Sequence, residues 1–450
     1  MSKSRLKSTG HVAVSRSCEP EVTKQPSGGY IGWLLRSFIF FAFFYLYLWL
    51  YVDLKLIYHG AGIITNFPVF YKSWSFFLSF LPYPGGPVEY VSAFLSQLFY
   101  YSWAGALVIT VQAWLMYLCL CYLFKAARLW GRYLICFILP ILLLVAYTQY
   151  TYHFTTTMAF LTALLTSCIY LKTTRSSDKF LSFVVIFLLL SVILYYLAGG
   201  AFLLFAIICA TYELFFRARW KVSLFYLLCA AAVPYVLGLL IFQVSIVSAF
   251  DNLLPFSWRI LKYDARKRGV EIIYVLYLVT PLILLVFGIL HMLGERLHFA
   301  QNKTKKKRRN KSSNPLLNIF SFCKNSPKLK WAAGSLLLFS IAGSAIFFSR
   351  NESLRTRFKV DYYAYHKMWP DLLITAQRNA ADPFIANAVN RALYNVGRLG
   401  YDMFSWPQHK DYLFLSGKEH KWVDWQVFDL YLDIGLVGIA GAGRKKLFNN

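Results

Sequence analysis

Between the first two long apolar runs of the chain stands the sequence Leu81-Pro82-Tyr83-Pro84-Gly85-Gly86-Pro87-Val88-Glu89-Tyr90. It lies in the connection 53–101, the only long one in the first half of the chain. The three prolines exclude a continuous helix, and Gly85-Gly86 permits a tight turn. Aromatic residues on both sides suit a membrane–water interface. We predict an interfacial helix, a fixed turn and a second short helix that leads into the second apolar run.

The composition is that of a membrane protein. Of the 450 residues, 58% are hydrophobic and 15% are charged, whereas a soluble domain carries about 25% charged residues. Several apolar runs approach the ~20 residues that a helix needs to cross a bilayer. The sequence therefore predicts an all-α, polytopic protein in a lipid bilayer. Its nine expected spans are Ser37–Ile57, Ser102–Phe124, Tyr133–Tyr147, Thr156–Leu171, Phe180–Leu197, Ala201–Phe216, Val222–Val247, Val270–Leu293 and Trp331–Phe348.

The formal charge of +27 is explained by membrane topology rather than by a nucleic-acid partner. The segments 1–36, 125–132, 172–179, 217–221 and 295–330 together hold 26 Lys and Arg residues against four acids. These segments alternate with nearly uncharged connections, which is the pattern of the positive-inside rule. We therefore expect the N-terminus in the cytoplasm and the C-terminal part outside. Glu213 and Arg217, four residues apart, are expected to pair at the cytoplasmic interface.

Three domains are expected. Residues 1–36 are polar and basic and predict a disordered cytoplasmic tail, and 37–348 form the transmembrane domain. Residues 350–450 show helical periodicity, and two loosely similar stretches recur 38 residues apart, Tyr394–Leu399 and Leu432–Val437. This spacing approaches the ~34-residue period of tetratricopeptide hairpins. An apolar helix around Trp422–Ile434, followed by a short basic tail, leads us to expect that the chain stops inside a repeat.

Residues able to carry chemistry are scattered, because the chain has no nucleotide-binding, nucleophile or zinc motif. Asp53 and Glu89, beside the first connection's helices, are the candidate general bases or ligands of a divalent cation. For Glu89 the alternative is a purely structural role in the first turn of a helix. Arg259, Lys262 and Arg266 form a basic excess in another outer connection. They predict either a phosphate site that shares a hollow with the two acids, or a solvated loop.

The overall plan resembles membrane-embedded glycosyltransferases that use lipid-linked sugars. The features shared with that class are short helices, a long first outer connection containing an acid, and a soluble C-terminal extension. The resemblance implies that Asp53 or Glu89 acts as the base or metal ligand, on a substrate linked to polyprenyl phosphate at the outer leaflet. The adjacent pair of acids typical of the class is absent.

Two stretches also resemble an uncharacterised family of bacterial multi-spanning proteins. They are Pro84–Gln97 and the tail Asn387–Gln408, and the resemblance extends over nearly the whole chain. It implies a protein of the bacterial inner membrane with tetratricopeptide-like hairpins on the outer side. Two functions remain open: a glycosyltransferase-like enzyme, or a non-catalytic scaffold that binds an envelope protein through residues 350–450.

Overall fold

The computed structural model describes residues 27–60, 67–127, 133–175, 180–255, 268–304, 327–408 and 429–439. Regular structure in these ranges is helical, with no strand among them, so the all-α prediction is confirmed. Seven of their helical segments are long and apolar enough to cross a membrane. These segments are Gly32–Val52, Ser102–Ala126, Phe154–Thr174, Phe180–Phe215, Trp220–Ile241, Glu271–Leu293 and Trp331–Ser349.

The membrane domain follows the expected order of elements. Its parts are α1 (Ser27–Leu46) with the π-helix η1 (Tyr47–Val52), α2 (Lys55–His59), α3 (Trp74–Phe80), α4 (Gly86–Ser96) with η3 (Gln97–Tyr100), α5 (Ser102–Ala126), η4 (Tyr133–Phe137) with α6 (Ile138–Thr148), α7 (Phe154–Thr174), α8 (Phe180–Ala198), η5 (Gly199–Ala201), α9 (Phe202–Phe215), α10 (Trp220–Val233) with the π-helix η6 (Pro234–Ile241), α11 (Ile246–Asp251), α13 (Arg268–Thr304) and α15 (Pro327–Ser349). The interfacial helix, turn and second helix predicted in the first connection correspond to α3, residues 81–85 and α4.

The count of nine spans stays a prediction. The run expected at Tyr133–Tyr147 contains only a shorter apolar helix, Leu134–Thr148. The segment Phe180–Phe215 joins two expected runs, which η5 separates into α8 and α9. Gly199 in this turn has a φ of 55°, a backbone conformation that glycine adopts without steric cost.

The first helix begins at Ser27, upstream of the predicted boundary at Ser37. The added turns include Arg36, a charge that the sequence analysis placed outside the membrane. In the structure its guanidinium donates to the Ser335 hydroxyl at 3.0 Å and to the Trp331 carbonyl at 2.9 Å. These neutral acceptors on α15 satisfy donors of the guanidinium.

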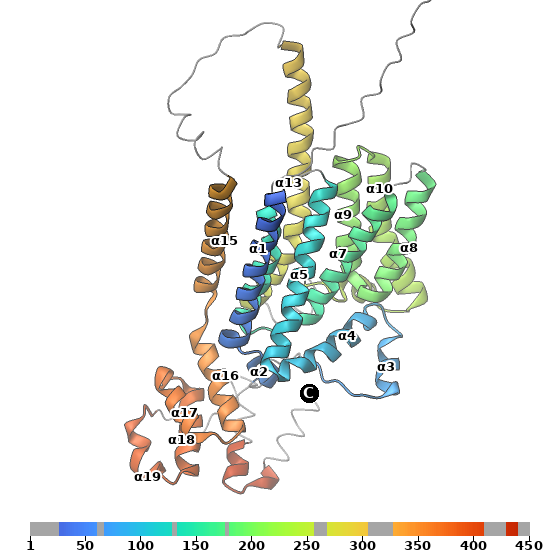
Figure 1. The fold of residues 1–450 in the computed structure, drawn as a ribbon. Coiled ribbons are helices and arrows are strands. Elements are labelled where there is room, and N and C mark those ends of the chain that lie inside the picture. Colours follow the sequence, from blue (N-terminus) through green and yellow to red (C-terminus); the bar gives the residue numbers. More distant parts are fainter. Residues whose placement is uncertain are drawn as a thin grey trace, which may run out of the picture.

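The two ends of the bundle carry different segments (Figure 1). At one end lie the start of α1, the ends of α5, α7 and α9, and the start of α15; we call it the basic end. At the other end lie α2, α3, α4 and the helices after residue 350; we call it the hairpin end. The described parts of the basic segments and the helices of the first connection thus lie at opposite ends, as the charge pattern predicts. Which end faces the cytoplasm stays a prediction.

Polar side chains join the buried parts of the spans. Tyr117 on α5 is fully buried and its hydroxyl lies 3.0 Å from that of Ser37 on α1. The amide of Gln112 donates to the Thr157 hydroxyl on α7 at 3.0 Å. Such interhelical hydrogen bonds stabilise helices in lipid, where apolar packing alone has no hydrophobic driving force.

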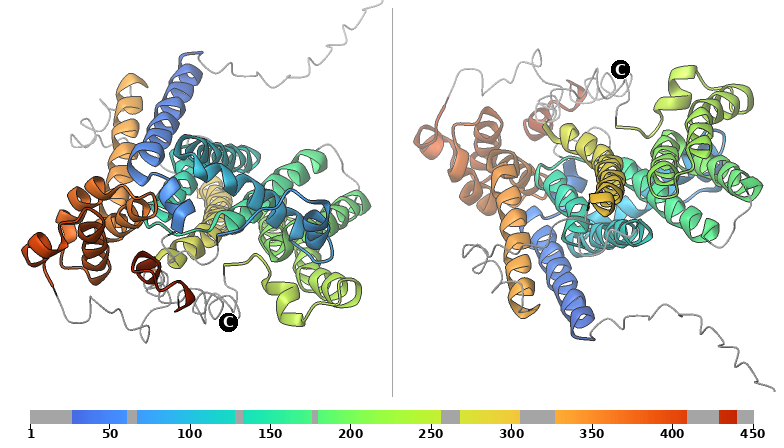
Figure 2. Two further views of the ribbon diagram at one scale, coloured as in Figure 1. Left: turned by 90° about the horizontal axis from the view of Figure 1, so that it is seen from below. Right: turned by 90° about the horizontal axis from the view of Figure 1, so that it is seen from above.

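The hairpin domain consists of α16 (Glu352–Tyr365), α17 (Trp369–Ala376) with η7 (Gln377–Asn379), α18 (Pro383–Asn395), and α19 (Leu399–Asp402) with η8 (Met403–Ser405). Its own buried core is centred on Val360, Leu372, Phe384, Val389 and Leu393. Asp382 caps α18 by accepting from the Phe384 N–H at 3.0 Å, as the Asp-Pro signal predicts. Figure 2 shows the domain beside α1 and α15, on the side of the bundle away from α8 to α10.

Three turns of this domain have the same backbone closure. The two similar stretches around Gly397 and Gly435 are turns that both place the glycine at positive φ, with values of 71° and 84°. A third such turn, missed in the sequence because it lacks glycine, has Lys367 at 57°. In each turn, the residue after the one at positive φ donates its N–H to the carbonyl five residues earlier; these donors are Met368, Arg398 and Leu436. The described residues 350–408 and 429–439 therefore repeat one turn geometry.

Candidate functional site

The first predicted site residue, Asp53, lies where the first span ends. Its φ is 57°, and its N–H donates to the Leu48 carbonyl at 3.0 Å, which closes the π-helical turn. The carboxylate accepts a hydrogen bond from the Ser102 hydroxyl and pairs with Lys55 at 3.3 Å. Asp53 therefore holds the end of the first span against the start of α5, and its charge is balanced locally.

The surroundings of Asp53 form the junction with the hairpin domain. His59 on α2 lies 2.6 Å from the carboxylate of Asp361 on α16. The hydroxyl of Tyr51 donates to Glu352 at the start of α16. That hydrogen bond lowers the pKa of the Glu352 carboxyl, while partial burial acts in the opposite direction. Polar contacts thus fix α16 against the first span.

The glycine turn before α4 is docked by backbone contacts. The Gly85 N–H donates to the Tyr196 carbonyl on α8 at 2.9 Å, and the Asn252 amide donates to the Pro84 carbonyl at 2.5 Å. The Asn252 carbonyl in turn accepts from the Gly200 N–H at 2.8 Å. Three connections at the hairpin end are joined in this way, which explains the glycines: side chains would separate the backbones.

Glu89, the second predicted acid, lies in the first turn of α4. Its N–H donates to the Gly85 carbonyl at 3.1 Å, and its carboxylate accepts from the Tyr83 hydroxyl at 2.6 Å. Burial raises the pKa of the Glu89 carboxyl, and the hydrogen bond from Tyr83 opposes this shift. The position is consistent with the structural alternative, a carboxylate at a helix N-terminus.

The structure gives the two predicted acids separate partners. Asp53 contacts Ser102, which follows α4 and η3, whereas Glu89 lies at the opposite end of α4. Arg259, Lys262 and Arg266 lie outside the described residues. Asn252, shortly before them, contacts the turn beside Glu89. Within the described ranges, no three His, Cys, Asp or Glu side chains form a group that could hold a metal ion.

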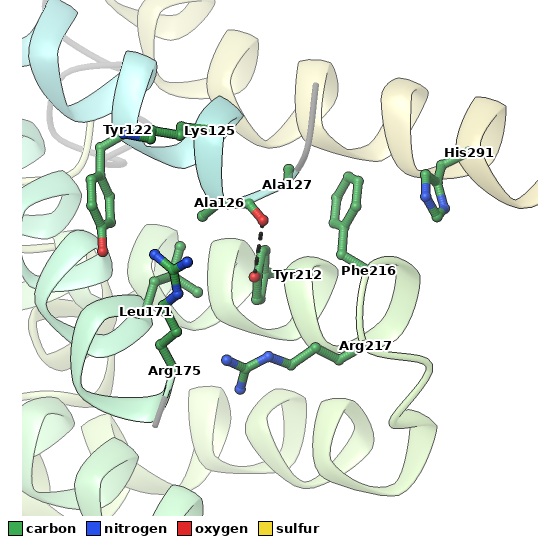
Figure 3. Close-up of a pocket in the computed structure, with 10 residues that line it drawn as sticks. All are labelled: Tyr122, Lys125, Ala126, Ala127, Leu171, Arg175, Tyr212, Phe216, Arg217 and His291. Carbon is green, nitrogen blue, oxygen red and sulfur yellow. Dashed lines mark hydrogen bonds between the residues drawn. The ribbon is translucent and has the colours of Figure 1, made fainter. Parts of the chain in front are cut away.

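A cavity that the sequence analysis did not identify lies at the basic end (Figure 3). Its volume is about 710 Å³, and it is lined by residues of α5, α7, α9 and α13 together with those just after them. The lining residues are Tyr122, Lys125, Ala126, Ala127, Leu171, Arg175, Tyr212, Phe216, Arg217 and His291. Three of them, Lys125, Arg175 and Arg217, are basic residues that we expected to fix the membrane topology and, for Arg217, to pair with Glu213. The feature of the sequence that could have indicated the cavity is that each of these basic residues lies near the last turn of a span.

Behind the cavity lies the predicted Glu213–Arg217 pair, at 3.1 Å. It differs from the expected surface pair because Glu213 is fully buried. The Tyr170 hydroxyl donates to the same carboxylate oxygen at 2.9 Å, and Arg219 lies 3.9 Å from the other oxygen. Tyr226 completes the group with a hydroxyl 2.8 Å from that of Tyr170. The i,i+4 spacing predicts the ion pair but not its burial. The packing of neighbouring helices buries Glu213 and adds the tyrosines to its hydrogen-bond network.

Comparison with known proteins gives a family without an activity. A family described as "Family of unknown function (DUF6057)" matches residues 29–442. Neither the curated proteins nor the solved structures include a significant match to the chain. We expected a resemblance to an uncharacterised family over nearly the whole chain, and the matched range confirms that extent.

Proposed function

The chain belongs to the family of unknown function DUF6057, and we propose that it is a membrane scaffold. In this proposal the hairpin domain, a tetratricopeptide-like array, presents a docking surface to an envelope protein at the predicted outer face of a bacterial inner membrane. The observation that carries it is the junction between α16 and the first span, through His59–Asp361 and Tyr51–Glu352. A domain fixed in this way presents its later hairpins in a defined direction, which reduces the entropic cost of binding a partner.

Two aromatic side chains at the end of the hairpin domain supply the surface. Tyr401 and Phe404, three residues apart on α19 and η8, are 89% and 85% exposed. Their backbone is held by the domain core, because Leu399 packs against the α16–α18 core. Exposed aromatic residues on a rigid support are typical anchors of protein–protein interfaces.

We expect the double variant Tyr401→Ser/Phe404→Ser of the full chain to lose its partner. Truncation of an interface anchor costs about 2 kcal/mol or more, so recovery should fall at least about tenfold. The measurement is quantitative cross-linking in native membranes, followed by purification through a tag on the chain. The control is Tyr71→Ser/Trp74→Ser, which removes exposed aromatics at the hairpin end but outside the domain. Equal recovery from both double variants would refute the docking surface.

A second candidate is transfer of a sugar from a polyprenyl-phosphate carrier. The observation that favours it is the Glu89 carboxyl, half-buried at the interfacial helices with a raised pKa. In such a reaction Asp53 or Glu89 would take the proton of the acceptor hydroxyl, or hold a divalent cation. Arg259, Lys262 and Arg266 would bind the leaving phosphate, as guanidinium and ammonium groups do in other phosphate sites.

For this candidate we expect Glu89→Gln and Asp53→Asn each to abolish transfer while the protein level in the membrane is kept. A base with a raised pKa must be ionised, so activity should fall as the pH falls through that pKa. The assay follows a labelled sugar from a synthetic polyprenyl-phosphate-linked hexose into membrane acceptors. Asp371→Asn, an exposed acid on α17, is the control. Transfer that persists in both site variants would exclude these residues as the base.

A further inference from the structure

The cavity at the basic end has an unusual distribution of charge. Lys125, Arg175 and Arg217 line it, and no Asp or Glu is among the described residues of its lining. Figure 3 shows that Arg175 and Arg217, from two different helices, extend their guanidinium groups into the same space. Like charges in one space repel unless an anion lies between them. Of the three cations, Arg217 has a counter-charge in Glu213, which is not among the residues that line the cavity.

One of the three cations is held in a fixed position. Arg217 donates to Glu213 at 3.1 Å and to the Thr174 carbonyl at 3.3 Å. Its guanidinium also stacks 5.5 Å from the centre of the Tyr212 ring, which itself lines the cavity. The buried Glu213 is fixed in turn by Tyr170. A pre-positioned guanidinium loses little entropy when it binds a ligand.

A simpler explanation accounts for only part of this arrangement. Cations at helix C-termini neutralise the carbonyls there and fix topology. Arg217 and Tyr212 do contact such carbonyls, since Tyr212 donates to the Ala126 carbonyl at 3.3 Å. By contrast, Lys125 and Arg175 have no hydrogen bond or ion pair with any residue in the described ranges. In the part of the chain that the structure describes, their ammonium and guanidinium donors are therefore left for a ligand.

We propose that this cavity binds a phosphate group, carried either by a lipid headgroup or by a soluble phosphate compound. Arg175 and Arg217 would contact the phosphate oxygens from two sides, and Lys125 would contribute a third charge. Leu171 and Phe216 give the cavity an apolar wall for the rest of the ligand. The volume of about 710 Å³ falls within the range of small-molecule sites. This site lies at the end opposite the hairpin domain and is independent of the proposed docking surface.

The test uses the full chain in two kinds of nanodisc, made of phosphatidylcholine alone or with added phosphatidylglycerol. Inorganic phosphate is titrated into the first kind, with chloride at matched ionic strength as the blank. Lipid retained from the second kind is measured by native mass spectrometry. The variant Lys125→Gln/Arg175→Gln is compared with Lys172→Gln, which removes an exposed charge from α7 away from the cavity.

We expect saturable binding of phosphate or selective retention of phosphatidylglycerol, weakened at least tenfold in the double variant and unchanged in Lys172→Gln. Binding of phosphate identifies a soluble ligand, and retention of phosphatidylglycerol without it identifies a lipid. The proposal is overturned if neither binds, or if the double variant and Lys172→Gln lose binding equally. Normal unfolding temperatures of both variants show that a loss is not a folding defect.

Discussion

Replacement of Gly86 by alanine is expected to remove most of the folded protein from the membrane. A Cβ atom at this position would lie 1.7 Å from the Phe80 carbonyl oxygen, far inside contact distance. The obstructing atom belongs to the backbone and cannot rotate away, so the turn between α3 and α4 must open. Opening it would also strain the hydrogen bond from Gly85 to Tyr196. We expect a loss of about 3 kcal/mol or more in the free energy of unfolding.

Gly343→Ala is the matched control for this substitution. Gly343 lies within α15, and an added Cβ there meets no atom within 4 Å. Alanine favours a helix over glycine by about 1 kcal/mol, so this variant should fold as well as the original chain. The measurement is the amount of monodisperse protein recovered after detergent extraction, followed by thermal unfolding. Similar recovery of both variants would contradict the structural account of the glycine turn.

Replacement of Glu213 by alanine is expected to destabilise the basic end of the bundle. The change leaves Arg217 without its carboxylate and removes the acceptor of the Tyr170 hydroxyl. Removal of one partner from a buried ion pair costs about 3–5 kcal/mol. We expect the lower part of that range, because Arg217 borders the cavity and water can reach it. The free energy of unfolding in mixed micelles, titrated with dodecyl sulfate, measures the effect.

The double variant Glu213→Ala/Arg217→Ala distinguishes the cost of an unpaired charge from the cost of lost packing. If the cost comes from an unpaired charge, removal of Arg217 as well should restore part of the lost stability. Glu271→Ala, which changes an exposed acid at the start of α13, should have little effect. Additive losses in the double variant would show that Glu213 and Arg217 contribute independently.

The sequence by itself determined the class of the protein, the elements of the first connection and the separation of charge. In a bilayer, backbone groups must be satisfied within the segment, so a long apolar run has helix as its available structure. The expected run Ser102–Phe124 and the observed helix Ser102–Ala126 agree for this reason. The turn before α4 was equally predictable, because the restrictions that proline and glycine impose are local. Local signals likewise gave Asp382 as a helix cap.

Only the tertiary structure decided which residues meet. His59 and Asp361 are 302 positions apart, and the glycine turn is joined to two connections far along the chain. The periodicity of apolar residues does not predict these contacts, because a span is apolar on its lipid-facing side as well as on its buried side. The pattern of apolar residues therefore does not fix how each helix is rotated about its axis. That rotation buries Glu213 and brings Lys125, Arg175 and Arg217 to one cavity. Tertiary contacts likewise give Asp53 and Glu89 different partners, Ser102 and Tyr83.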